Sequence, residues 1–112
     1  MTIEYKSEIY NLTTSNLTTT LTVNATTRFI VKEISVANDH NNTVEVNYYL
    51  NKVNGSAVFY HARVAANSND NAVHNTLVME ENDYLTFQAN GGANFISGQI
   101  SYAVLSRKNQ NG

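Results

Sequence analysis

The residue types that most often carry chemistry are sparse and scattered in this sequence. The three histidines, His40, His61 and His74, are far apart and show neither the HxH nor the HExxH spacing of a zinc site. There are no cysteines, and no GxSxG segment marks a nucleophilic serine. We therefore predict no catalytic residues, no metal site and no cofactor, and we expect that the protein is not an enzyme.

Two segments are rich in acidic or amide side chains that could bind a metal ion or transfer a proton. The segment Asn67–Asn71 (NSNDN) has the oxygen-rich character of a calcium loop, but Asp70 is its one carboxylate. Calcium sites gain affinity from carboxylates, whereas Asn and Asp side chains also cap turns, so we interpret the segment as a loop. The pair Glu80-Glu81 precedes Asn82-Asp83 and is expected to be a solvated turn rather than an acid–base pair.

Aromatic side chains gather in the middle of the chain. Tyr48, Tyr49, Phe59 and Tyr60 lie in two segments that alternate between apolar and polar residues. Alternation in a sheet sends about half of such residues inward, which leaves Tyr49 and Phe59 as the predicted exposed aromatic contact. Exposed aromatic residues are typical of protein interfaces and also stack on sugars, so a protein partner or a glycan is possible.

These aromatic residues must be positioned by a β-hairpin between Thr43 and Val64. Asn54-Gly55 separates its two alternating runs and is a strong hairpin signal. A two-residue Asn54-Gly55 loop would set the apolar side chains of one run beside the polar ones of the other. A three-residue loop from Val53 to Gly55 instead places both apolar sets on one face, because a one-residue slip reverses every side chain. We expect this second register, with Gly55 in a left-handed conformation.

The remaining sequence predicts further strands and no helix. Strands are expected at Leu17–Val23, Arg28–Ala37 with a phase shift near Lys32, Val73–Met79, Tyr84–Ala89, and Phe95–Ser106 with a bulge or close backbone contact at Gly98. Together they indicate about eight short strands in an all-β antiparallel β-sandwich, either jelly-roll or Ig-like. The expected core is Ile34, Val36, Val46, Tyr48, Leu50, Leu77, Leu85, Phe87, Ile100 and Val104.

The first residues allow two interpretations. Residues 1–12 are either an edge strand or an arm that becomes ordered on a partner, followed by a sandwich domain over 13–107 and a polar tail over 108–112. The candidate docking residues of this arm are Ile3, Tyr5, Ile9 and Tyr10. If the arm interpretation holds, deleting residues 1–12 leaves a folded domain that binds its partner poorly.

Composition narrows the classes of partner. Charged residues make up 14% of the sequence and the net charge is −2, so we expect no nucleic-acid binding, which normally needs a basic surface. The sequence has no apolar run of roughly 20 residues, and we expect no membrane insertion. Residues 1–12 also lack the basic start and apolar middle of a signal peptide.

The order of strands and turns resembles a known group of proteins. FIVKEISVAN, VEVNYYL, TLVMEENDYLTFQA and ISYAVLSR resemble segments of small β-sandwich virion proteins of tailed bacteriophages, across Arg28–Arg107. These are capsid decoration (cement) proteins and tail accessory proteins. The resemblance supplies no motif residues, and residues 1–12 depart from the shared pattern.

This resemblance implies a structural protein without enzymatic activity. It would be made in the host cytoplasm and sit in many copies, or as a homo-oligomer, on the virion. The most favoured partner is the major capsid protein, whose shell it would stabilise from outside, or another virion protein. Two alternatives remain: a tail or tail-fibre accessory protein, and a carbohydrate-binding adhesin module.

Overall fold

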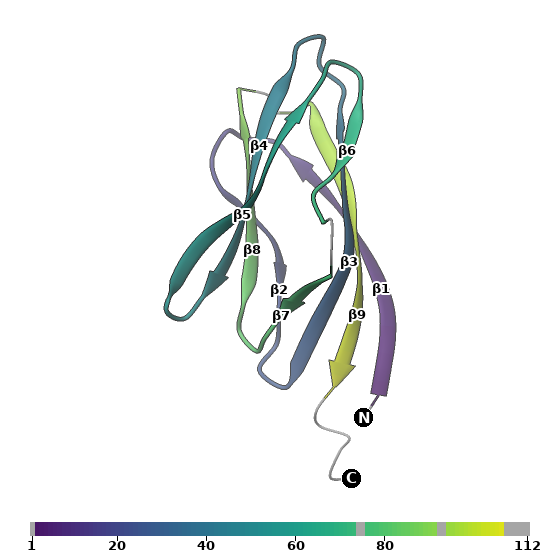
Figure 1. Ribbon diagram of the computed structural model, residues 1–112, viewed down its shortest axis with the longest axis vertical. Helices are drawn as coiled ribbons and strands as arrows, with labels where there is room; N and C mark the ends of the chain where they lie inside the picture. The colour runs from purple at the N-terminus through teal and green to yellow at the C-terminus, as the bar shows by residue number, and fades with distance from the viewer. Residues whose placement is uncertain (1, 74–75, 92–93, 107–112) are drawn as a thin grey trace.

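The computed structural model describes residues 2–73, 76–91 and 94–106. Strands make up most of these residues, and none of them is helical. Two antiparallel sheets face one another (Figure 1), which confirms the prediction of an all-β sandwich. Within the described residues no helix is present that could span a membrane.

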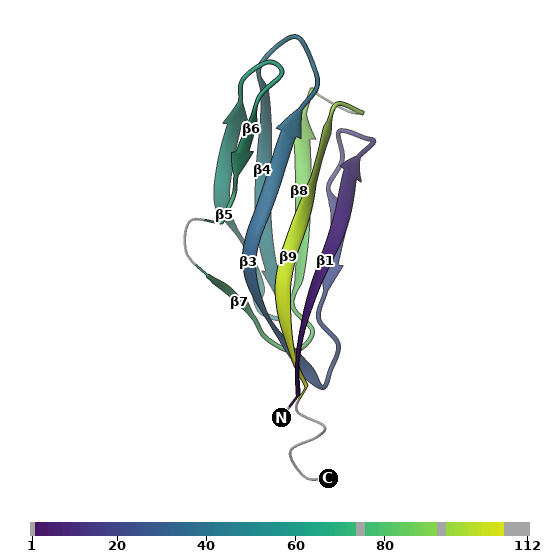
Figure 2. The same cartoon turned by 90° about the vertical axis from the view of Figure 1, so that its right-hand side faces the viewer.

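The two sheets divide the nine described strands unequally. Sheet A contains β1 (Thr2–Leu12), β9 (Ile96–Ser106), β3 (Thr27–Asn38), β6 (Asn69–Asn71) and β7 (Leu77–Met79). Sheet B contains β2 (Thr18–Thr22), β8 (Tyr84–Asn90), β4 (Val44–Lys52) and β5 (Gly55–Val64). In sheet A the order is β1-β9-β3, and β6 and β7 pair with different parts of the far edge of β3 (Figure 2). β3 has 12 residues and extends by one residue at each end beyond the strand expected over Arg28–Ala37.

One apolar core fills the space between the sheets. Eight of the ten predicted core residues are buried, and Leu50 and Leu77 are half-buried at its margin. The alternation of apolar and polar residues in β8 and β9 therefore correctly predicted which side chains face the core. Every buried side-chain nitrogen and oxygen in the described residues has a hydrogen-bond partner.

The β4–β5 hairpin matches the predicted register at its base and differs at its tip. Val44 lies opposite Val64 and Tyr48 lies opposite Tyr60, as expected. A bulge between Tyr48 and Tyr49 then shifts the pairing, so that Lys52 meets Gly55 and the loop has two residues instead of three. The extra residue of β5 is Phe59, because it has no direct partner in β4.

Elsewhere one predicted irregularity is confirmed and several boundaries are wrong. The pairing of β3 with β9 shifts between Val31 and Glu33, beside Lys32 as predicted. The strand expected over Leu17–Val23 spans Thr18–Thr22, so Leu17 lies outside it and is 54% exposed. A register shift between Thr19 and Leu21 interrupts the pairing of β2 with β8.

The segment between β5 and β8 also differs from the prediction. Asn69–Asn71, expected as part of a loop, forms β6 on β3, and the strand expected over Val73–Met79 begins only at Leu77. Its residues 74–75 lie outside the described part of the chain. Pairing with β3 supplies the backbone partners that the local sequence alone did not indicate.

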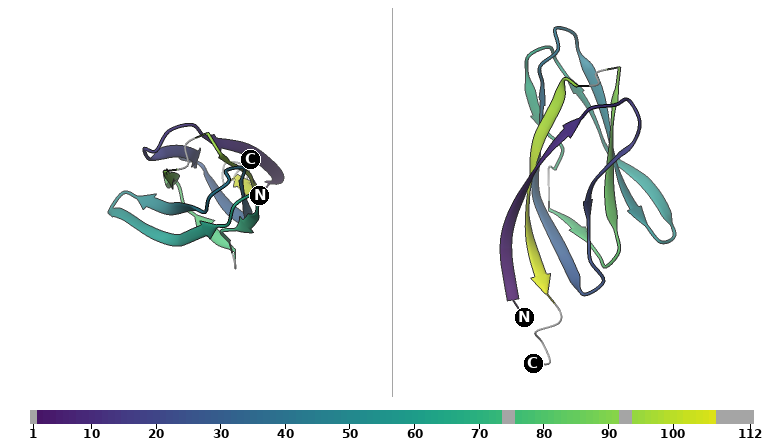
Figure 3. Two further views of the ribbon diagram at one scale, coloured as in Figure 1. Left: turned by 90° about the horizontal axis from the view of Figure 1, so that it is seen from above. Right: turned by 180° about the vertical axis from the view of Figure 1, so that it is seen from behind.

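The sandwich is long and narrow, with extents of 53 × 27 × 22 Å. β1 starts and β9 ends at the same end of the molecule, where Thr2 lies opposite Ser106 (Figure 3). The two strands stay paired without a register shift from there to Leu12 and Ile96.

Candidate functional site

The most exposed apolar side chains of sheet A lie along its edge strand, β1. Ile3, Tyr5 and Ile9 alternate with inward-facing residues and are 53%, 79% and 80% exposed, respectively. β1 is the last strand of sheet A, and no described strand pairs with its other edge. A long, straight, apolar edge is a common site of pairing with another chain. Three of the four predicted docking residues therefore stand at an accessible edge.

The fourth predicted docking residue, Tyr10, is part of the core. It is 5% exposed, and its ring makes an edge contact with Phe87, with ring centroids 5.0 Å apart. Leu12 is buried as well. Because both side chains pack in the core, we expect deletion of residues 1–12 to destabilise the sandwich rather than to leave an intact domain.

A glycine on the neighbouring strand makes the burial of Tyr10 possible. Tyr10 lies directly opposite Gly98 of β9, and its hydroxyl donates a hydrogen bond to the carbonyl oxygen of Ser35 on β3, at 2.6 Å. A Cβ atom at Gly98 would lie 1.9 Å from that same carbonyl oxygen. The predicted close backbone contact at Gly98 is thereby confirmed, and the tyrosine that uses the space was missed.

The Tyr10 hydroxyl also joins the two sheets. Its oxygen lies 3.3 Å from the hydroxyl oxygen of Tyr48 in sheet B. Since the Tyr10 proton is given to Ser35, the Tyr48 hydroxyl is the donor in this second bond. Burial raises the pKa of both phenols well above their usual value, so both stay neutral.

In the part of β1 before Tyr10, the residues on the inward-facing side are charged. Glu4, Lys6 and Glu8 alternate there and are exposed. Glu8 accepts a hydrogen bond of 3.0 Å from the buried hydroxyl of Tyr102 on β9. Burial, followed by this hydrogen bond and the charge of Glu8, raises the pKa of Tyr102 to about 12. This half of the edge is therefore polar on one side and apolar on the other.

The apolar side continues as a row across the outer face of sheet A. Tyr5 lies opposite Ala103, Ala103 opposite Ile30, and Ile30 opposite Val78, so that four strands contribute in register. Val78 is 47% exposed and Ile30 is half-buried, whereas Ala103 between Tyr5 and Ile30 is buried. In Figure 2 these strands lie side by side facing the viewer. Sequence alternation alone could not reveal this row, because it depends on strand order.

The second predicted contact, the pair Tyr49 and Phe59, does not form one exposed surface. Both side chains are half-buried. Phe59 packs against the core with its ring centroid 6.2 Å from that of Tyr48, because the bulge turns Phe59 and Tyr60 toward the same residue. Tyr49 follows Tyr48 in the same strand and so faces the other side of sheet B.

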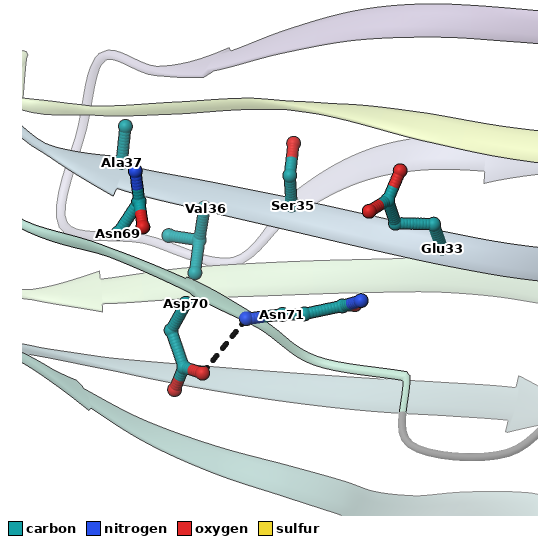
Figure 4. Close-up of a pocket in the computed structure, with 7 residues that line it drawn as sticks. All are labelled: Glu33, Ser35, Val36, Ala37, Asn69, Asp70 and Asn71. Atoms are coloured by element: carbon teal, nitrogen blue, oxygen red, sulfur yellow. Dashed lines mark hydrogen bonds between the residues drawn. The ribbon is translucent and has the colours of Figure 1, made fainter.

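A shallow cleft lies at the opposite edge of sheet A, between β3 and β6 (Figure 4). It has a volume of about 510 Å³ and includes Glu33, Ser35, Asp70 and Asn71 in its lining. Both carboxylate oxygens of Asp70 already accept hydrogen bonds, one from the Tyr60 hydroxyl and one from the Asn71 backbone. Asp70 thus holds β5 and β6 together.

The residues considered for metal binding lie apart from one another. His40 makes an edge contact with the ring of Phe95, and a nitrogen of His61 lies 2.6 Å from the side-chain oxygen of Asn47. Within the described residues no group of three or more His, Asp or Glu side chains is placed to hold a metal ion. His74 lies outside the described residues. Glu80 forms an ion pair of 2.7 Å with Arg28.

One comparison with a solved structure bears on the fold. No family model and no curated protein matches the sequence. A solved structure described as "Bacillus endospore appendages form a novel family of disulfide-linked pili" is similar, with a TM-score of 0.51 and 15% sequence identity. The similarity covers 92% of this chain and 86% of the other. At this identity the likeness concerns the fold.

Proposed function

We propose that this chain is a structural protein that acts by assembling with protein partners, in the form of a capsid decoration protein of a tailed phage. The observation that carries the proposal is the accessible β1 edge with Ile3, Tyr5 and Ile9 exposed beside it. A soluble domain normally protects such an edge with proline, a bulge, a covering segment or inward-pointing charges, and of these β1 has the charges Glu4, Lys6 and Glu8. β1 contains no proline and no register shift.

The outer face of sheet A extends the same surface. The row from Tyr5 to Val78 offers apolar contact area beside the hydrogen-bonding edge. A partner that packs on the outer face of sheet A would bury this row, and burial of apolar area favours the assembled state. Such a protein stabilises a shell by mass action, because it binds the assembled form alone.

The test is binding of the purified chain to phage shells from which the native copies have been removed. We expect Tyr5→Lys combined with Ile9→Lys to weaken binding by about tenfold or more, because a lysine cannot replace the buried apolar contact. Val53→Lys is the matched control, since Val53 is 88% exposed at the tip of the β4–β5 hairpin. Equal binding by all three proteins, or reconstructions that place the chain on the tail or its fibres, would overturn the capsid proposal.

A fibre subunit is the second candidate, and the similarity to a pilus protein favours it. That solved structure is described as one of disulfide-linked pili. The present sequence has no cysteine, so copies of this chain would have to join without disulfides. Electron microscopy of the purified chain separates the candidates. A fibre subunit forms filaments alone, and a decoration protein does not.

An adhesin module that binds carbohydrate has less support. This alternative rests on exposure of the pair Tyr49 and Phe59, but Phe59 packs against the core. Titration with host polysaccharide while tyrosine fluorescence is measured would test this alternative.

A further inference from the structure

We infer that β1 is a self-pairing edge, through which two copies of this chain join their A sheets in an antiparallel dimer centred on Ser7. The inference deepens the proposed function, on which it rests, by naming a second copy as the occupant of this edge, which leaves the outer face of sheet A for the shell. It follows from the order of residues along β1 and from the side on which each one lies.

The geometry of such a dimer leaves few registers. Two identical antiparallel strands are related by a two-fold axis perpendicular to the sheet. The axis must pass midway between the two copies of one residue of β1. Directly opposed residues then lie on the same face of the joined sheet. The odd-numbered residues of β1, which include the exposed apolar ones, therefore meet one another, and so do the even-numbered residues, which include the charged ones.

The register centred on Ser7 gives two favourable kinds of pair and leaves Ile3 opposite Asn11 and Glu4 opposite Tyr10. Thr2 of one copy lies opposite Leu12 of the other, so the pairing uses the whole of β1. On the outer face, each Tyr5 lies opposite the partner's Ile9, an aromatic–aliphatic pair that occurs twice. On the inner face, each Lys6 lies opposite the partner's Glu8, an oppositely charged pair that also occurs twice.

The neighbouring registers are worse in identifiable ways. Centring on Lys6 sets Lys6 against Lys6 and Glu4 against Glu8, and centring on Glu8 sets two Glu8 carboxylates together. Centring on Tyr5 restricts the overlap to residues 2–8 and leaves Ile9 outside the paired segment. Inward-pointing charges usually protect an edge from unwanted pairing, and here they select one register.

The other long edge of the described structure lacks this arrangement. β5 borders sheet B, and it begins with the small residues Gly55, Ser56 and Ala57. Its bulge at Phe59 interrupts regular pairing. β1 pairs with β9 without a register shift and carries the larger exposed apolar side chains.

A cysteine scan tests the register directly, because the chain has no cysteine of its own. Single substitutions Tyr5→Cys, Lys6→Cys, Ser7→Cys and Glu8→Cys are oxidised under mild conditions, and disulfide-linked dimer is measured on a non-reducing gel. We expect Ser7→Cys to give the most dimer, since only residue 7 faces its own copy. Maximal linkage at another position would overturn the register.

A charge exchange tests the same register without a covalent bond. Sedimentation equilibrium should show that Lys6→Glu weakens the dimer by about tenfold or more, because each substitution acts at two symmetric pairs. Lys6→Glu combined with Glu8→Lys should restore it. Val53→Lys should have no effect, and circular dichroism checks that every variant is folded.

Two results would overturn the inference: a wild-type chain that stays monomeric up to millimolar concentration, or a dimer that Lys6→Glu leaves unchanged. Either result leaves the proposed function open, because shell binding is measured separately. Conversely, a dimer centred on Ser7 that binds no shell would support this inference and remove the capsid proposal.

Discussion

At the scale of single residues, Tyr10 does the most to define the fold of the edge. Its side chain passes over Gly98, and its hydroxyl donates a hydrogen bond to the Ser35 carbonyl and accepts one from the Tyr48 hydroxyl. Three strands of sheet A and one of sheet B thereby meet at one hydroxyl group. The exposed residues on either side of Tyr10 can vary without affecting this arrangement, which separates the structural role of β1 from its surface.

We expect Tyr10→Phe to lower the free energy of unfolding by about 1–3 kcal/mol, because the buried Ser35 carbonyl and Tyr48 hydroxyl both lose a partner. Urea unfolding followed by circular dichroism measures the change. Tyr5→Phe is the matched control, since Tyr5 is 79% exposed, and it should be neutral. A loss below about 0.5 kcal/mol for Tyr10→Phe would show that water replaces the missing partner.

At the scale of elements, the bulge in the β4–β5 hairpin decides which side chains reach the core. It turns Phe59 and Tyr60 toward Tyr48 and shortens the loop to Val53 and Asn54. Gly55 follows this loop with a φ of +142°, and there is open space where a Cβ atom would lie. The requirement for glycine is thus a matter of backbone conformation alone.

Gly55→Ala should accordingly lower the free energy of unfolding by about 1 kcal/mol or more, since alanine is strained at this φ. Thermal and urea unfolding provide the measurement. Ser56→Ala, at the next exposed position of β5, serves as the control and should change stability by less than about 0.5 kcal/mol. Comparable effects of the two substitutions would rule out a special conformation at Gly55.

Most elements could be predicted from the sequence because alternation is a local signal. The inward faces of β8 and β9, the shift beside Lys32 and the base of the hairpin all follow from neighbouring residues. The burial of Tyr10 could not be predicted in this way, since it depends on Gly98, which becomes its neighbour only through strand pairing. The row from Tyr5 to Val78 has the same origin.

At the scale of the whole molecule, tyrosine burial links stability to pH. The pKa values of Tyr10, Tyr48, Tyr60 and Tyr102 are all raised, chiefly because burial disfavours the phenolate. Unfolded tyrosines ionise near pH 10. Between pH 10 and pH 12 the unfolded chain therefore binds fewer protons than the folded one, and stability falls as the pH rises.

We expect the full stability below pH 10 and a progressive loss between pH 10 and pH 12. Each tyrosine that stays neutral only in the folded state contributes a slope of about 1.4 kcal/mol per pH unit. Urea unfolding across this range should show a shallower slope for Tyr102→Phe than for the wild type, because Tyr102 titrates only at about 12. Identical slopes for the two proteins would contradict the raised pKa of Tyr102.

The pairing of β1 with β9 also has a consequence for the time at which the molecule folds. Ribosomes release β1 well before β9, and β9 is the strand that covers one edge of β1 and accommodates the ring of Tyr10. While the chain is being made, at about 5–20 residues per second, β1 has both edges open and its tyrosine uncovered. Sheet A can therefore close only after residue 106 has left the exit tunnel. Nascent chains on one messenger, held close together during that interval, have an opportunity to pair through β1 before either is folded.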